Sequence, residues 1–425
     1  MRKVVWLGVF FISSVSLIHA QVIPDSGQPT ATTLNSDAQT TPPVSVGSEG
    51  LLFSTPHKAY QLRVHGYIQA DDRYFSSNLH GEELDTFFFR KIRPLFEGTL
   101  FNAVDFRFMP DFGQNNPQIQ EAYLELKSIP FAKLRVGKFK EPLGLEALRS
   151  DRGLTFPERS LASDLIPLRY MGAQVGGTIL SKTITYAAGY FNGSNDGSNG
   201  NFQWLQDNEL AARFFAHPFA ATGVKGVEQF GIGIGGSEGD QHGSISGLKT
   251  AGQSTFFKYS SGVLANGQHN RVSPQAYYYF GPVGLLSEYV ISSQDVLSQS
   301  ATRRLRIDAW QIAGSVVLTG EKNGYDGIRP RHAFEPSKGF SHLGTLELAV
   351  RYSHLEVDRN AFSSFANPKT AARQASERAI GVTWYLNSYA KLLAYYEHTQ
   401  FGMASINLTP LHSEDVLMSR VQLAF

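Results

Sequence analysis

The sequence predicts an all-β protein: a transmembrane antiparallel β-barrel of about 16 strands with an inward-folded third extracellular loop. Long stretches alternate between apolar and polar residues, as strands do when one face meets lipid and the other meets water. After residue 20 there is no run of about eighteen apolar residues, which excludes a membrane helix. Because lipid cannot satisfy an open sheet edge, strands that enter a membrane must close into a barrel.

The composition fits this class. The chain has 425 residues, with 40 glycines, 30 phenylalanines, 18 tyrosines and no cysteine. Aromatic residues are typical of the girdles at both membrane surfaces, and an exported chain without cysteine has no disulfides. The formal net charge of +1 becomes −1 once the leader, with its two basic residues, is removed. Any basic character is therefore local, and we expect no nucleic-acid partner.

The chain divides into three regions. Residues 1–20 are interpreted as a secretory signal peptide, because Arg2 and Lys3 precede a largely apolar stretch that ends at the small residue Ala20. An uncleaved membrane anchor is the alternative, but the apolar stretch is short for a span. Residues 21–58 are rich in Thr, Ser, Pro, Gln and Gly, which predicts a flexible periplasmic arm. Residues 59–425 are the predicted outer-membrane barrel.

Period-two alternation begins in the first predicted strand, 60–73. There Leu62, Val64 and Ile68 share one face, and charged or polar residues share the other. A soluble sandwich would show the same alternation, but repeated strands of about ten residues favour the membrane. The pattern recurs at 87–99, 105–112, 119–127, 133–140, 170–180, 183–191, 209–217, 227–235, 271–280, 284–295, 303–319, 343–357, 378–386 and 391–401, and in a last strand that ends with residues 421–425.

An even number of strands places both termini on the periplasmic side, and the connections mostly alternate between short turns and long loops. Among the long loops is a polar one at 236–268. Residues 320–340 break the rule, because this connection is long where a short periplasmic turn is expected.

The segment from Leu134 to Gly172 is the least regular part of the barrel sequence. It begins as a strand, loses its alternation from 141 to 169, and becomes a strand again at Tyr170. So long a charged loop is usually functional or disordered, and its many leucines argue against disorder. We therefore expect it to fold back and pack against the inner wall.

The lumen-facing sides of the predicted strands carry many charges. Alternation places these cations there: Arg63, Arg73, Lys91, Arg93, Arg107, Lys127, Arg135, Arg213, Arg351 and Arg420, with Asp111 among the acids on the same faces. Lys138 and Lys140 lie on the inner face with Arg135 only if Gly137 forms a β-bulge. Such charges can set the ion preference of a water-filled pore. The alternative is that many of them pair across strands and support the wall.

Enzyme signatures are weak. Residues 235–239, GGSEG, match G-x-S-x-G literally, but a nucleophile elbow needs a helix after the serine, and a loop is expected here. The histidines do not form an H-E-x-x-H pair, and the glycine-rich strand 231–235 is followed by no helix. We therefore expect no catalytic, cofactor or metal site.

Several segments resemble the phosphate-selective porin O/P family, including FFFRKIRPLFEG at 87–98, DFRFMPDFG at 105–113, RVGKFKEPLGLE at 135–146 and LELAVRYSHLE at 346–356. The resemblance implies a sixteen-stranded barrel, usually a trimer, with arginines leading to a lysine-bearing anion site. By this resemblance, Arg90 and Arg93 match the family's basic pair on the second strand, and Asp111 matches the acid after the third strand. Arg135, Lys138 and Lys140 match the basic strand that enters the inward loop, and Arg213 matches the basic position of the eighth strand. Arg90 has the opposite parity to Lys91 and Arg93, so a regular strand cannot place it on their face.

These observations predict an outer-membrane porin of a Gram-negative bacterium that gives passive, anion-preferring diffusion of phosphate, polyphosphate or similar small anions. The expected partners are those anions, outer-membrane lipid and two further copies in a homotrimer. The candidate pore-lining residues are Arg90, Lys91, Arg93, Arg107, Asp111, Arg135, Lys138, Lys140, Arg213 and Arg351. Glu141, Glu146 and Glu158 bring negative charge near the site and argue against strict phosphate selectivity. The alternatives are a plugged barrel acting as a surface binding or structural protein, and a non-selective porin.

Overall fold

The computed structural model describes residues 44–47, 50–77, 85–129, 131–180, 183–193, 207–224, 226–299, 301–404 and 411–425. The predicted signal peptide and residues 21–43 of the predicted arm lie outside these ranges.

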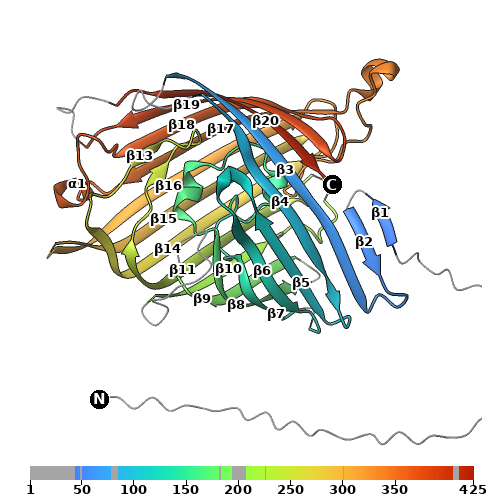
Figure 1. Ribbon diagram of the computed structural model, residues 1–425, viewed down its shortest axis with the longest axis horizontal. Coiled ribbons are helices and arrows are strands. Elements are labelled where there is room, and N and C mark those ends of the chain that lie inside the picture. Colours follow the sequence, from blue (N-terminus) through green and yellow to red (C-terminus); the bar gives the residue numbers. More distant parts are fainter. Residues whose placement is uncertain are drawn as a thin grey trace, which may run out of the picture. The chain divides into compact units, whose positions relative to one another are not determined.

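Sixteen of the described strands close into an antiparallel barrel, which confirms the predicted fold class (Figure 1). Each strand pairs with the next one along the chain, and the last strand pairs with the first through partners such as Val421 and Ala70. The wall strands are β3 (Tyr60–Ser77), β4 (Thr86–Leu100), β5 (Val104–Asp111), β6 (Gln118–Leu126), β7 (Lys133–Lys140), β8 (Arg169–Ile179), β9 (Ile184–Phe191), β10 (Asn208–Ala216), β11 (Phe230–Ser244), β14 (Val263–Phe280), β15 (Val283–Ser298), β16 (Ala301–Val317), β17 (Thr345–Val357), β18 (Gln374–Tyr385), β19 (Ala390–Gly402) and β20 (Glu414–Ala424).

Alternating exposure along each strand separates the outer face of the wall from the lumen. On β20, Leu417, Val421 and Leu423 are exposed, whereas Arg420 and Gln422 are buried. The apolar side chains therefore face outward and the polar ones face inward. This is the arrangement that lipid outside and water inside require.

Two regions of the chain differ from the sequence-based expectation. A hairpin of β1 (Val44–Gly47) and β2 (Gly50–Ser54) lies within residues 21–58 and pairs with the start of β3. The strands β11 and β14 also extend well into 236–268, where the sequence predicts a loop, so Ser237 of the G-x-S-x-G match lies within a strand. Polar residues occupy both faces of these extensions, which hides the period-two signal.

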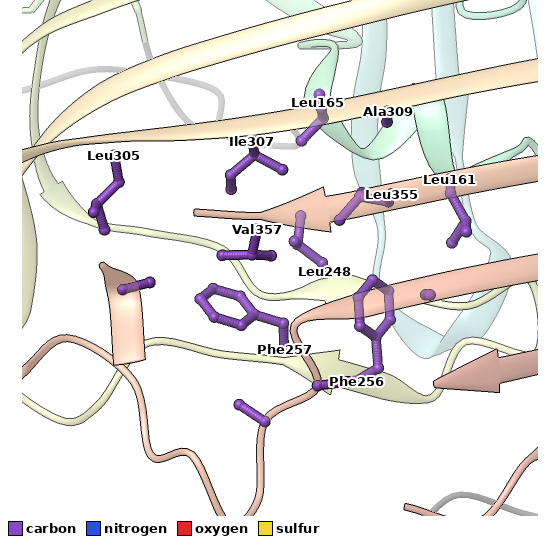
Figure 2. Close-up of a cluster of buried hydrophobic side chains, with 14 of the residues drawn as sticks. Leu161, Leu165, Leu248, Phe256, Phe257, Leu305, Ile307, Ala309, Leu355 and Val357 are labelled. Atoms are coloured by element: carbon purple, nitrogen blue, oxygen red, sulfur yellow. The ribbon is translucent and has the colours of Figure 1, made fainter. Parts of the chain in front are cut away.

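Three connections pack together against the inner faces of β15, β16 and β17. They are the segment 141–168, with the turns η2 (Asp151–Gly153) and η3 (Leu161–Leu165); the segment 245–262, with β12 (Leu248–Lys249) and β13 (Thr255–Phe257); and the segment 358–373, with α1 (Ala361–Ser364). Figure 2 shows Leu161 and Leu165 of the first segment and Leu248, Phe256 and Phe257 of the second beside Ile307 and Leu355 of the wall. This apolar cluster occupies space that the wall alone would leave open to water. No helix among the described residues is long and apolar enough to cross a membrane.

The long connection 318–344, with η4 (Pro336–His342), is also tied to the segment 141–168. The hydroxyl of Tyr325 donates a hydrogen bond of 2.7 Å to the carbonyl of Leu145, and Nε of Arg149 donates one of 2.9 Å to the carbonyl of Tyr325. The ring of Tyr325 stacks on Tyr277 of β14, with 5.0 Å between centroids. The connection 318–344 is longer than a periplasmic turn is expected to be, and this length lets it reach both the wall and the segment 141–168. The remaining short helix, η1 (Gly113–Asn115), follows β5.

Candidate functional site

The basic residues of β4 meet carboxylates from the segment 141–168. Arg90 donates two hydrogen bonds to the Glu158 carboxylate, at 2.6 and 3.0 Å, and Lys91 lies 3.1 Å from Asp151. Arg93 is paired with Asp151 and also with Asp111, at 2.6 Å. The predicted cluster of Arg90, Lys91, Arg93 and Asp111 is therefore brought together, but its positive charge is largely neutralised.

A β-bulge explains how Arg90 joins its neighbours. The β3–β4 pairing shifts register between Gln69, which faces Lys91, and Ala70, which faces Phe89. Arg90 is the extra residue at this shift, so strict alternation is interrupted. Its side chain is thereby free to reach Glu158, which a regular strand would prevent.

The carboxylates of the segment are strongly held by cations. Glu158 lies 2.9 Å from Arg73 of β3 and 3.4 Å from Arg420 of β20, in addition to its contact with Arg90. Burial alone would raise the pKa of Glu158, but the three guanidinium groups hold it below its usual range. The pKa of Asp151 is likewise lowered, against the effect of burial, by Arg159, Lys91 and Arg93.

Next to these ion pairs lies a cavity of about 380 Å³ between the segment 141–168 and the inner faces of β3 to β10. Its charged lining has more cations than anions. The cations are Arg107, Arg135, Lys140, Arg169 and Arg213, and the anions are Glu121 and Asp151. The cavity is therefore electropositive and suited to a small anion.

Three of the five cations have carboxylate partners. Arg107 lies 2.7 Å from Glu97, Arg135 lies 2.5 Å from Glu125, and Arg169 lies 3.2 Å from Glu121. Arg135 is also held by the ring of Tyr123, 4.4 Å from the guanidinium carbon. These contacts fix the three guanidinium groups along the cavity wall, and the carboxylates offset their positive charge.

The other two cations, Lys140 and Arg213, have no carboxylate partner among the residues that the structure describes. Nζ of Lys140 donates hydrogen bonds to the carbonyls of Ala147 and Arg149, at 2.8 and 2.5 Å. Nε of Arg213 donates to the side-chain oxygen of Gln275, at 3.0 Å. These neutral partners orient the two groups and add no negative charge beside them, and both groups line the cavity that an anion would enter.

The bulge that the sequence suggested at Gly137 is absent, because β7 pairs with β6 and β8 in unbroken register. Gly137 does adopt a positive φ of 131°. Lys140 reaches the cavity from the end of β7, whereas Lys138, paired with Ala122 and Met171, is not among the residues that line it.

Four predicted residues thus line the cavity: Arg107, Arg135, Lys140 and Arg213. Arg351 does not, because it is buried against Glu377, at 2.7 Å, and Glu397, at 3.4 Å, and supports the wall instead. Asp151 and Arg169 line the cavity but were not among the predicted site residues. Alternation could not find them, because the segment 141–169 has none.

Comparisons with known proteins agree with this geometry. The family described as phosphate-selective porin O and P matches residues 62–425. Porin O of Pseudomonas aeruginosa is 23% identical over 382 residues, which cover 82% of this chain and 84% of that protein.

Solved structures show the same fold at low identity. OmpT of Vibrio cholerae, solved in a trimer form, has a TM-score of 0.55 at 12% identity and covers 86% of this chain and 100% of its own. An anion-selective porin from Comamonas acidovorans has a TM-score of 0.52 at 10% identity, with the same coverage of the two chains. The sixteen-stranded wall, the charged lumen and the family match across the barrel together lead to one conclusion. The chain belongs to the phosphate-selective porin O and P family and is a porin of the Gram-negative outer membrane.

Proposed function

We propose that this porin gives passive, anion-preferring diffusion of phosphate, polyphosphate or similarly small anions, and that the cavity between Lys140 and Arg213 is its selective point. One observation carries the proposal. Lys140 and Arg213 lie in the lumen with neutral hydrogen-bond partners, and neither has a carboxylate partner among the described residues. In a narrow aqueous passage such charges concentrate anions and repel cations. The segment 141–168 acts here as the inward-folded extracellular loop that narrows the lumen.

The same arrangement argues against a strong preference for phosphate. Arg90, Lys91 and Arg93 are engaged by Glu158 and Asp151, so neither the two guanidinium forks nor the lysine ammonium is free to bind phosphate. The proposed channel therefore prefers anions in general, with phosphate as one permeant among them. The names of similar proteins support an anion-preferring porin, since one relative is a porin O and one similar solved structure is an anion-selective porin. We further propose a homotrimer, as in the trimer form of OmpT.

The test is planar-bilayer recording under a KCl gradient, followed by phosphate titration. The wild-type protein should give a reversal potential that favours chloride. The variant Lys140→Gln/Arg213→Gln should lose most of this preference, because each removed charge contributes about 1 kcal/mol at a separation of roughly 8 Å in a partly aqueous site.

Two single variants control for the loss of charge as such. Lys138→Gln removes a neighbouring cation that does not line the cavity, and Arg378→Gln removes an exposed arginine on the wall. Both should keep the wild-type reversal potential. A wild-type current that favours potassium, or an unchanged preference in the folded double variant, would contradict the proposal.

A second function is favoured by the apolar cluster that fills part of the lumen. If the three packed connections block the passage, the barrel acts as a surface binding or structural protein through its external loops. In that case the purified protein would insert into bilayers, as judged by protease protection, without any measurable current.

A further inference from the structure

Three apolar side chains face the lumen on neighbouring strands, at positions where alternation otherwise places charged and polar groups. They are Tyr67 of β3, Leu95 of β4 and Met109 of β5, all three buried and packed into one apolar cluster. The three strands pair in this order in the wall (Figure 1). Leu95 lies two residues from Arg93 on the same face, and Met109 lies two residues from Arg107. The charged lining of the wall therefore contains an apolar patch, formed by Tyr67, Leu95 and Met109.

This apolar patch forms part of the wall of the electropositive cavity. Two apolar residues of the segment 141–168, Pro142 and Leu148, line the same cavity. The hydroxyl of Tyr67 accepts a hydrogen bond of 2.9 Å from Arg93, so the polar end of this side chain is already engaged. The cavity therefore has an apolar surface in addition to its cations.

The apolar patch and the two cations without a described carboxylate partner lie on different parts of the wall. The patch spans β3 to β5, whereas Lys140 is the last residue of β7 and Arg213 lies on β10. The lining is thus apolar toward β3 and positively charged toward β10. A ligand with one apolar end and one negatively charged end matches this division.

The two acids of the lining are held by other cations. Glu121 lies 3.2 Å from both Arg107 and Arg169, and Asp151 lies 2.6 Å from Arg159. These contacts offset the negative charge of both carboxylates. An anion in the cavity is therefore not opposed by an unpaired carboxylate of the lining.

The apolar patch distinguishes organic anions from inorganic ones. Chloride and phosphate carry no apolar surface, so contact with the patch does not favour them. Each methylene group that moves from water into apolar surroundings raises affinity by about fourfold at most. The cavity volume of about 380 Å³ lies within the range of sites that hold small organic ligands.

We propose that the cavity binds organic monocarboxylates with a short aliphatic or aromatic body. Lys140 and Arg213 attract the carboxylate, and Tyr67, Leu95 and Met109 contact the body. The inference rests on the proposed function, because it requires an anion-preferring passage through this cavity. It adds the class of permeant, since an organic anion binds there more tightly than an inorganic anion of the same charge.

Block of the chloride current by a series of carboxylates tests the proposal. Potassium acetate, butyrate and hexanoate are added at pH 7 to wild-type channels in symmetric KCl. The half-blocking concentration should fall about twofold to fourfold for each added methylene. Hexanamide, which has the same body but no charge, should not block at the concentrations at which hexanoate does. No block, equal half-blocking concentrations for the three carboxylates, or an equal block by hexanamide would overturn the proposal.

Substitutions of one methionine test the role of the apolar patch. Met109→Gln replaces the apolar side chain by a polar one of similar size, and in conducting channels it should flatten the dependence on chain length. Met109→Leu keeps an apolar side chain and should keep the dependence. Met418→Gln is the matched control, because Met418 is buried on the inner face of β20 and does not line the cavity. An unchanged dependence in Met109→Gln, or an equal loss in Met418→Gln, would contradict the assignment.

The organic-anion site and the anion-preferring passage fail in different ways. A wild-type reversal potential that favours potassium contradicts the passage, and with it the site. A reversal potential that favours chloride, together with equal half-blocking concentrations for acetate and hexanoate, leaves the passage in place and overturns only the organic-anion site.

Discussion

At the scale of single residues, the cations of the lumen differ in whether a carboxylate pairs with them. Arg90 and Arg93 are attractive candidates in the sequence, yet both are neutralised by Glu158, Asp151 or Asp111. Buried ion pairs of this kind hold structure together, because removing one partner leaves the other charged and unsolvated. Lys140 and Arg213 differ, since carbonyl and amide oxygens satisfy their hydrogen bonds without adding negative charge.

The variant Glu158→Gln tests this distinction. We expect a loss of about 3 kcal/mol in the free energy of unfolding, because Arg73, Arg90 and Arg420 lose their shared counter-ion inside the barrel. Anion preference should rise at the same time, since these arginines gain net charge in the lumen. Urea unfolding in lipid vesicles and reversal potentials measure the two effects.

Asp308→Asn is the matched control for Glu158→Gln. Asp308 pairs with Arg306 at 2.8 Å, in a pair whose side chains are 30% and 54% exposed. A surface pair of this kind contributes less than about 1 kcal/mol. Equal destabilisation by the two variants would contradict the assigned role of Glu158.

At the scale of elements, acidic residues of the segment 141–168 help to hold it in place. Glu146 accepts hydrogen bonds from the backbone and hydroxyl of Ser160, both at 2.9 Å. Burial alone would raise the pKa of Glu146, but Arg351 and Ser160 lower it. Glu146, Asp151 and Glu158 thus all favour the ionised form in the folded protein. The segment keeps its position through these charges as well as through its leucines.

Acid should therefore loosen this segment before the barrel unfolds. Because the folded pKa values of the three carboxyls lie below the unfolded ones, their stabilising contribution is present at neutral pH and is lost as the pH falls below about 4. Single-channel currents should be quiet at pH 7 and fluctuate at pH 3. The variant Asp151→Asn/Glu158→Gln should fluctuate at both values. Currents that are equally quiet at pH 3 and pH 7 in the wild type would show that these charges do not hold the segment.

At the scale of the whole molecule, the lumen is divided between two kinds of environment. Beside β15, β16 and β17, three connections form the apolar cluster that includes Phe256 and Phe257. Beside β3 to β10 lies the electropositive cavity. The proposed passage is therefore eccentric, and its width depends on connections far apart in the sequence.

Replacing residues 248–257 by a Gly-Ser linker of equal length tests this division. The linker removes Leu248, Phe256 and Phe257 from the cluster, so water should enter the vacated space and the single-channel conductance should rise. The reversal potential should change little, because Lys140 and Arg213 are untouched. A conductance equal to that of the wild type would place the cluster outside the passage.

The sequence by itself determined the barrel, because lipid outside and water inside impose a period of two on every strand that crosses the membrane. The same period placed Arg107, Arg135 and Arg213 on the lumen side, where the structure finds them. The end of β11 from residue 236 onward has polar residues on both faces. The apolar–polar alternation is lost there, and the sequence predicts a loop.

Only the tertiary structure decided which charges remain free and what fills the lumen. The partners of Arg90 and Arg93 come from a segment without periodicity, so no local pattern could match Glu158 or Asp151 to them. The bulge at Arg90 and the unbroken register at Gly137 likewise depend on how neighbouring strands pair. Charge neutralisation acts through space between residues distant in the chain, whereas alternation acts between residues next to one another, and a sequence displays only the second directly.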